Sequence, residues 1–138
     1  MNGYVETILE LAKKSYDNDE VPVGAIVVRN NQIIGKGFND RENSHLITGH
    51  AEINAINDAC LHNKDWRLDD CVMYVTLYPC AMCAGAIVDS RICKVYYLLD
   101  RKNVYNNNAD FECEKILSPN YYDEYVKLLK LFFENKRK

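Results

Sequence analysis

The sequence predicts a three-layer α/β domain in which helices cover both faces of a mixed β-sheet. Short β-branched runs alternate with helical patterns along the chain, and a short polar turn joins the first two runs. The length is the third observation, because 138 residues suffice for one hydrophobic core and not for two domains. We therefore expect residues 1–138 to form a single domain.

The helices and strands follow from the spacing of apolar residues. In chain order the sequence predicts helix 5–16, strands 23–29 and 32–38, helix 50–62, strand 72–77, a helix that opens at Pro79, strand 94–99, a strand within 111–117, and a last helix over 122–133. Asn30-Asn31 joins the first two strands, and asparagine tolerates the positive φ angles of a tight hairpin. Thr48 is expected to cap the second helix, and residues 39–49 and 101–110 are expected to be polar loops. Strands joined through a helix should run parallel.

The charge and the apolar stretches exclude several classes of protein. Seventeen basic and 20 acidic residues give a net charge of −3, which does not favour general binding to the phosphate backbone of nucleic acids. The longest apolar stretches, residues 21–28 and 80–88, are too short to cross a membrane as helices. The N-terminal helical pattern carries Glu6 and Glu10 in place of an apolar signal core. We therefore expect a cytoplasmic protein with no membrane partner.

Six cysteines are present, and in a protein with no expected secretion signal they should stay reduced. Only Cys80 and Cys83 are closely spaced, which favours metal binding or redox chemistry at that pair. The others lie in apolar segments and are expected to be buried thiols: Cys60, Cys71, Cys93 and Cys113.

Two expected helix starts carry the residues of a metal site. One is His50-Ala51-Glu52, and the other is Pro79-Cys80-Ala81-Met82-Cys83. Two cysteines three residues apart point to one side of a helix, and together with one histidine they supply three zinc ligands. Three protein ligands leave a fourth position for water, which is typical of a catalytic zinc site. Glu52 beside such a site can take a proton from that water and pass it on.

His-x-Glu followed by Pro-Cys-x-x-Cys is the signature of zinc-dependent nucleobase deaminases. The cysteine pair alone would also fit half of a structural zinc site or a thioredoxin-like redox pair. Neither alternative explains His50 and Glu52. His45 and His62 lack a comparable partner pattern and are expected to be ordinary surface or loop residues.

Four segments match one family closely: residues 21–25, 35–39, 49–54 and 75–92. The most specific motif is Cys80-Ala81-Met82-Cys83-Ala84-Gly85-Ala86-Ile87, followed by Ser90-Arg91-Ile92. On these motifs the sequence resembles the bacterial tRNA-specific adenosine deaminases of the cytidine deaminase-like superfamily. The resemblance runs from about residue 5 to about residue 97 and resumes in the last helix.

The resemblance implies the cytidine deaminase-like fold, a five-stranded sheet between helices, in a homodimer. It implies that one zinc ion (Zn2+) is held by His50, Cys80 and Cys83. It also implies that Glu52 is the proton shuttle, and that Asn39 hydrogen bonds to the polar edge of the base with help from the backbone of Ala51.

Two segments depart from the family's pattern. Tyr78 stands where members usually carry glutamate directly before Pro-Cys. Members also have a glycine-rich segment after the fourth strand that helps to hold the tRNA anticodon loop. In this sequence the corresponding residues 98–105 are a shorter segment that contains no glycine.

We expect an enzyme, a zinc-dependent hydrolase that releases ammonia from a nucleobase. Its expected reaction is the deamination of the wobble adenosine of tRNA to inosine, with the anticodon loop as its partner. The alternative is a deaminase of a free base or nucleoside, such as cytosine, guanine or cytidine, because a small substrate needs no RNA-holding segment. A non-catalytic subunit of a heterodimer would be expected to lack Glu52, which is present.

Overall fold

Helices and strands alternate along the chain as the sequence predicts, in a computed structural model that describes residues 2–101 and 111–136. The elements in chain order are α1 (Asn2–Asp17), β1 (Gly24–Arg29), β2 (Gln32–Phe38), α2 (Arg41–Ser44), α3 (Ala51–Asn63), β3 (Cys71–Leu77), α4 (Ala81–Ser90), β4 (Lys94–Leu99), β5 (Glu112–Lys115) and α5 (Pro119–Lys136). Residues 102–110, which include most of the expected polar loop at 101–110 and part of the departing segment 98–105, lie outside the described residues.

The five strands form one mixed sheet in the order β2-β1-β3-β4-β5. β1 pairs antiparallel with both β2 and β3, whereas β3, β4 and β5 run parallel to one another. The parallel pairing of β3 with β4 through α4 is the one that the sequence predicts. The strand expected within residues 111–117 is also confirmed, as β5 at the edge of the sheet.

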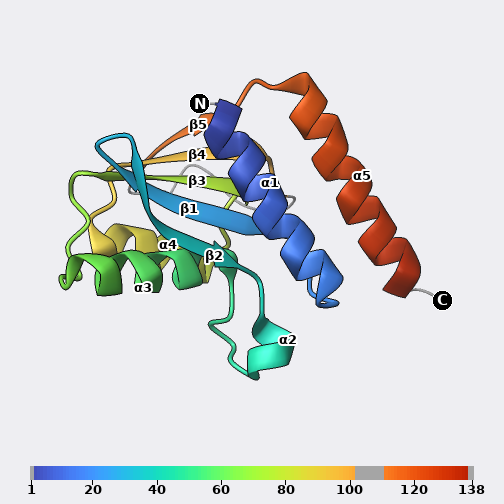
Figure 1. The fold of residues 1–138 in the computed structure, drawn as a ribbon, viewed down its shortest axis with the longest axis horizontal. Coiled ribbons are helices and arrows are strands. Elements are labelled where there is room, and N and C mark those ends of the chain that lie inside the picture. Colours follow the sequence, from blue (N-terminus) through green and yellow to red (C-terminus); the bar gives the residue numbers. More distant parts are fainter. Residues whose placement is uncertain (1, 102–110, 137–138) are drawn as a thin grey trace.

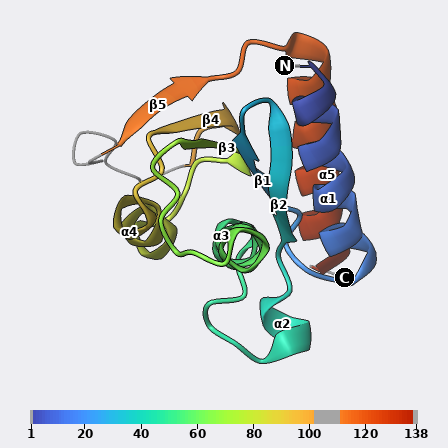
Figure 2. The same ribbon diagram turned by 60° about the vertical axis from the view of Figure 1, so that its left-hand side comes forward.

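Helices cover both faces of the sheet, so the predicted three-layer arrangement is confirmed. Figure 2 shows α1 and α5 against one face and α3 and α4 against the other. Each face has its own apolar core, one around Val27, Ala55 and Ile87 and the other around Ile8 and Tyr125. The two termini of the described chain belong to the same layer, since α1 and α5 lie side by side (Figure 1).

The β1–β2 hairpin turns at Asn30 and Asn31, whose φ angles are 49° and 64°. Positive φ at both positions is the geometry that the Asn-Asn sequence predicts. On β2, Gly35 and Gly37 face the backbone of α3 so closely that a Cβ atom at either position would overlap it. The absence of side chains at these two glycines lets α3 pack directly on β2, and this fixes where α3 begins.

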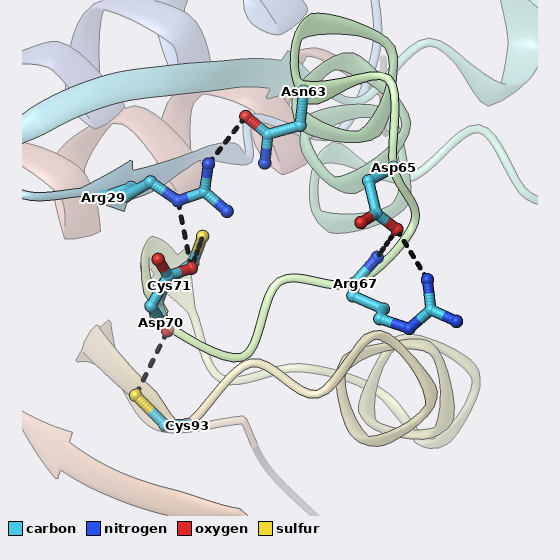
Figure 3. A network of polar contacts seen from close by, with 7 residues as sticks. All are labelled: Arg29, Asn63, Asp65, Arg67, Asp70, Cys71 and Cys93. Carbon is cyan, nitrogen blue, oxygen red and sulfur yellow. Dashed lines mark hydrogen bonds and ion pairs between the residues drawn. The ribbon is translucent and has the colours of Figure 1, made fainter.

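A polar network joins three elements at the end of the sheet where β1 finishes (Figure 3). Arg29 Nε donates to Asp70 Oδ1 at 3.0 Å, and Arg29 Nη1 donates to Asn63 Oδ1 at 3.1 Å. The hydrogen bond from Arg29 lowers the pKa of Asp70. The network ties the C-terminal end of α3 to the start of β3, and it lies at the opposite end of α3 from His50.

Three local expectations are wrong. Thr48 does not cap α3, because His50 occupies the N-cap position and its N–H donates to the Thr48 carbonyl at 2.7 Å. Pro79 does not open α4, since Cys80 is the N-cap and the helix begins at Ala81. The polar loop 39–49 contains the short helix α2.

The expectation that four cysteines are buried holds only in part. Cys71 is buried and Cys60 is half-buried, whereas Cys93 and Cys113 are exposed. These two thiols are exposed because Cys113 is on the edge strand β5 and Cys93 lies in the turn before β4. No helix within residues 2–101 and 111–136 is long and apolar enough to cross a bilayer.

Candidate metal centre and active site

The three predicted metal ligands lie together. His50 Nδ1 is 3.5 Å from Cys80 Sγ and 3.4 Å from Cys83 Sγ, although the histidine is separated from the cysteines by 30 and 33 residues. All three ligand atoms lie within 4.8 Å of one another. Among the described residues this is the one group of three or more His, Cys, Asp or Glu side chains with such spacing. The same residues are the ones that the sequence motif selects.

Two helix starts bring the ligands together. α3 and α4 lie side by side on one face of the sheet (Figure 2), and the residue that precedes each helix is a predicted ligand. His50 and Cys80 both have extended backbones, with φ of −99° and −72°. Within the described chain neither side chain makes an N-cap hydrogen bond to its own helix. Both side chains are therefore available to face each other, together with Cys83 in the first turn of α4.

The pKa values of the two thiols are shifted in opposite directions. The pKa of the Cys80 thiol is lowered to about 3, first because the Cys83 thiol hydrogen bonds to its thiolate and also because the His50 ring lies beside it. The pKa of Cys83 is raised by the same hydrogen bond and by burial. One thiolate sulfur, a second sulfur and an imidazole nitrogen make a soft donor set that suits zinc, so the residues fit the metal that the motif implies.

Glu52 is buried beside this cluster. Its side chain is 1% exposed, and its Oε2 atom has no hydrogen-bond partner among the described residues. Burial raises the pKa of its carboxyl above the ordinary value, the charge of Cys80 raises it further, and the charges of His50 and Arg101 lower it. A buried polar atom without a partner is destabilising, and next to metal-binding side chains it indicates a functional group.

Asn39 connects the loop before α2 to the start of α3. Its Oδ1 atom accepts a hydrogen bond from the Ala51 N–H at 2.8 Å, and its own N–H donates to the Val23 carbonyl at 3.2 Å. The residue is 8% exposed, and its Nδ2 atom makes no hydrogen bond within the described part of the chain. Asn39 therefore has a fixed orientation and a free donor.

A cavity of about 540 Å³ opens beside the cluster. His50 and Asn39 lie in its wall, together with the turn at residues 18–21, residues 41–43 of α2, and Phe132 and Phe133 of α5. Its volume is in the range of pockets that bind small molecules.

Sequence reasoning missed several residues that line this cavity or act on Glu52. Phe133 is placed by the sequence only within the last helix, but it is 48% exposed and lines the cavity. Arg101 is expected only as a loop residue, yet its Nε donates to the Tyr78 carbonyl at 2.9 Å and its charge acts on Glu52. Tyr78 is 2% exposed and packs edge to face on Tyr97. His45 and His62 are exposed, as expected.

A family model for MafB19-like deaminases matches residues 2–137. The tRNA-specific adenosine deaminase of Buchnera aphidicola subsp. Baizongia pistaciae is 39% identical over 144 residues, which cover 98% of this chain and 89% of that protein. The tRNA-specific adenosine deaminases of Streptococcus pyogenes serotype M18 and Bacillus subtilis are each 44% identical over 94 residues, 68% of this chain. The matches span only 59% and 58% of those two proteins.

Solved structures share the fold. A structure from a study of A-to-I editing by tRNA:A34 deaminases at the wobble position matches with a TM-score of 0.82 and 28% identity, over 91% of this chain and 99% of that chain. Guanine deaminase from Bacillus subtilis matches with a TM-score of 0.69 and 24% identity, over 91% of both chains, which shows likeness of fold alone. The expected cytidine deaminase-like fold is thereby confirmed. The chain belongs to the MafB19-like deaminase family and is similar to the tRNA-specific adenosine deaminases.

Proposed function

We propose that this protein is a zinc-dependent hydrolytic deaminase that converts the wobble adenosine of tRNA to inosine. The observation that carries the proposal is the position of a buried carboxylate, Glu52, beside the cluster of His50, Cys80 and Cys83. The tRNA-specific adenosine deaminases to which the chain is similar support the choice of reaction and substrate.

His50, Cys80 and Cys83 would hold the zinc ion through Nδ1 and two sulfur atoms. Bound zinc would supply a water molecule that loses a proton near neutral pH. Binding would also favour the thiolate form of Cys83, whose pKa is raised in the metal-free chain. Metal binding should therefore release protons.

Glu52 moves the protons of the reaction. Its free Oε2 atom accepts a proton from the attacking water and delivers it to the ring nitrogen next to the carbon that bears the amino group. The water oxygen bonds to that carbon, the carbon–nitrogen bond breaks, and a second proton from the water leaves with the amine as ammonia. Adenosine and water thus become inosine and ammonia.

Asn39 would orient the base. Its Oδ1 is held by the Ala51 N–H, so its Nδ2 is the group left to donate to an acceptor on the base edge. In this proposal the backbone of Ala51 contributes to substrate binding by fixing the side chain of Asn39.

The cavity supports a substrate larger than one base. It extends from His50 and Asn39 to Phe132 and Phe133, and one of these two rings is about half exposed. Exposed aromatic rings are the groups on which unpaired bases of RNA stack. An unpaired anticodon loop would occupy the cavity from His50 to Phe133, whereas a free base would leave most of the cavity empty.

We further propose that residues 1–138 act as a single deaminase domain in a cytoplasmic homodimer. The single sheet shared by all the described strands and the family match over residues 2–137 support one domain. The resemblance to tRNA deaminases supports the dimer, and a tRNA substrate agrees with a cytoplasmic location. Light scattering after size exclusion tests the dimer.

The test of the function is one assay on zinc-loaded protein. An anticodon stem-loop RNA with adenosine at the wobble position is incubated and analysed for inosine. Parallel reactions contain free cytosine, guanine, cytidine and adenosine, with ammonia as the readout. We expect inosine in the stem-loop. Ammonia from a free base or nucleoside without inosine in the RNA would refute the tRNA substrate and keep the deaminase chemistry.

A further inference from the structure

Glu20 is a buried carboxylate that the deamination chemistry does not use. It is 2% exposed, and no Lys, Arg or His side chain within residues 2–101 and 111–136 forms an ion pair with it. Its oxygens instead accept hydrogen bonds from the backbone N–H groups of Glu42 at 3.1 Å and Asn43 at 2.8 Å, and from Asn43 Nδ2. Three N–H donors thus converge on one carboxylate and fix its position.

These hydrogen bonds replace a cap that α2 lacks. The residue in the N-cap position is Asp40, whose side chain makes no cap hydrogen bond in the described chain. Its Oδ1 atom accepts from Asn54 Nδ2 at 3.0 Å, on the side of α3. Glu20, 20 residues earlier in the sequence, therefore satisfies the first N–H groups of α2, which would otherwise lack acceptors.

The segment that Glu20 holds is a wall of the cavity. Arg41, Glu42 and Asn43 line the cavity, and so does Glu20 itself. A second contact reinforces the attachment, because Asn43 Nδ2 also donates to the Asn18 carbonyl at 2.9 Å. The turn after α1 thus holds α2 against the space where a substrate would bind.

We propose that Glu20 is a positioning residue that holds the α2 wall in the geometry that binds substrate. The inference rests on the proposed deaminase function. Glu20 touches neither the metal ligands nor Glu52. Asn39 keeps its own anchors to Ala51 and Val23 when Glu20 is changed. Loss of the Glu20 carboxylate should therefore weaken substrate binding and leave the chemical step and the metal site unchanged.

The test compares Glu20→Gln with Asp17→Asn in the zinc-loaded enzyme. Glutamine has nearly the same shape, but its amide group would face an N–H donor where the carboxylate had an acceptor. Asp17 is exposed, lies three residues away in sequence and does not line the cavity, so its variant controls for loss of one acidic charge. KM and kcat are measured on the substrate that the wild-type enzyme deaminates, with zinc content and Tm in parallel.

We expect KM of Glu20→Gln to rise about tenfold, with kcat within about twofold of wild type and zinc content unchanged. Asp17→Asn should match wild type. An unchanged KM, or a fall in kcat together with loss of zinc, would overturn the positioning role while the wild-type activity preserves the proposed function. A wild-type enzyme without deaminase activity would overturn the proposed function, and the role of Glu20 with it.

If Glu20→Gln does not fold, Asn43→Ala tests the same contact by changing the residue whose side chain donates to Glu20. It removes Asn43 Nδ2, which donates both to Glu20 and to the Asn18 carbonyl, and keeps both backbone donors to Glu20. KM should then rise by about threefold at constant kcat, because one of the three hydrogen bonds to Glu20 is lost together with the one to Asn18. A KM equal to that of wild type would contradict the proposal.

Discussion

Replacement of Glu52 by glutamine should abolish turnover and leave the metal site intact. Glutamine fills the same buried space, and the three ligand side chains are unchanged. An amide cannot accept and return a proton, however, and the proposed reaction requires both steps at Oε2. General acid–base catalysis contributes about 10²–10⁴-fold, so we expect kcat to fall by about 10³-fold, which is about 4 kcal/mol of transition-state stabilisation.

The assay for Glu52→Gln is single-turnover formation of inosine in the stem-loop RNA, with zinc content measured on the same sample. Asp58→Asn is the control, since it removes an exposed carboxylate from the same helix. Turnover of Glu52→Gln at the wild-type rate would refute the assigned role. Loss of zinc along with activity would mean that Glu52 supports the metal site and that the reasoning from its free oxygen is wrong.

The same variant should also be more stable than wild type in the metal-free state, increasingly so as the pH rises. Burial raises the pKa of Glu52 in the folded chain above its ordinary value of 4.5. A group with a raised folded-state pKa contributes stability that is fully present below pH 4.5 and is lost as the pH rises through the folded-state pKa. Glutamine does not ionise, so the difference in Tm should be smallest below pH 4.5 and should grow as the pH rises above it. A difference independent of pH would show that the carboxylate is not desolvated.

Three further substitutions and one control separate the metal site from the stability of the fold. Cys83→Ala should lose zinc and activity together, whereas Cys113→Ala, at an exposed thiol, should keep both, which metal analysis after desalting will show. Tyr125→Phe should lower the free energy of unfolding in urea by about 1–2 kcal/mol, because it removes a buried 2.7 Å hydrogen bond to a backbone carbonyl. Asp70→Asn should reduce the loss of thermal stability that occurs as the pH falls. Because Arg29 lowers the pKa of Asp70, its contribution is present above the unfolded-state pKa and is lost as the pH falls through the folded-state value, as thermal unfolding between about pH 7 and pH 3 will test.

The fold could be predicted because its signals are local. Apolar periods of two and 3.6 residues place the strands and the longer helices within a few residues of their observed ends. Asn30-Asn31 selects the hairpin through backbone sterics alone. The four-residue helix α2 could not be predicted in this way, because it is too short for a period and its N–H groups are satisfied by Glu20 from another turn.

The residues of the candidate site could likewise be predicted only where the signal is local. His50, Glu52 and the two cysteines lie within short motifs, so their chemistry can be inferred from residue type and spacing. The placements of Arg101 and Glu20 depend on contacts with residues that lie more than 20 positions away. No local pattern marks such contacts, and only the packed structure shows which loop each side chain reaches.

The incorrect expectations at Thr48 and Pro79 both concern helix starts. Thr48 is expected as a cap because an N-cap usually carries a side chain that accepts from its own helix, and Pro79 is expected at the start of its helix because its missing N–H does no harm there. In this protein the N-cap positions of α3 and α4 hold His50 and Cys80, and neither caps its helix in the described chain. Both helices thus give up a stabilising contact at the end where the ligands meet. The opposite end of α3 carries the Arg29 network (Figure 3), in which Asn63 Nδ2 is buried without a hydrogen-bond partner among the described residues. Substitutions there should change stability without changing the chemistry.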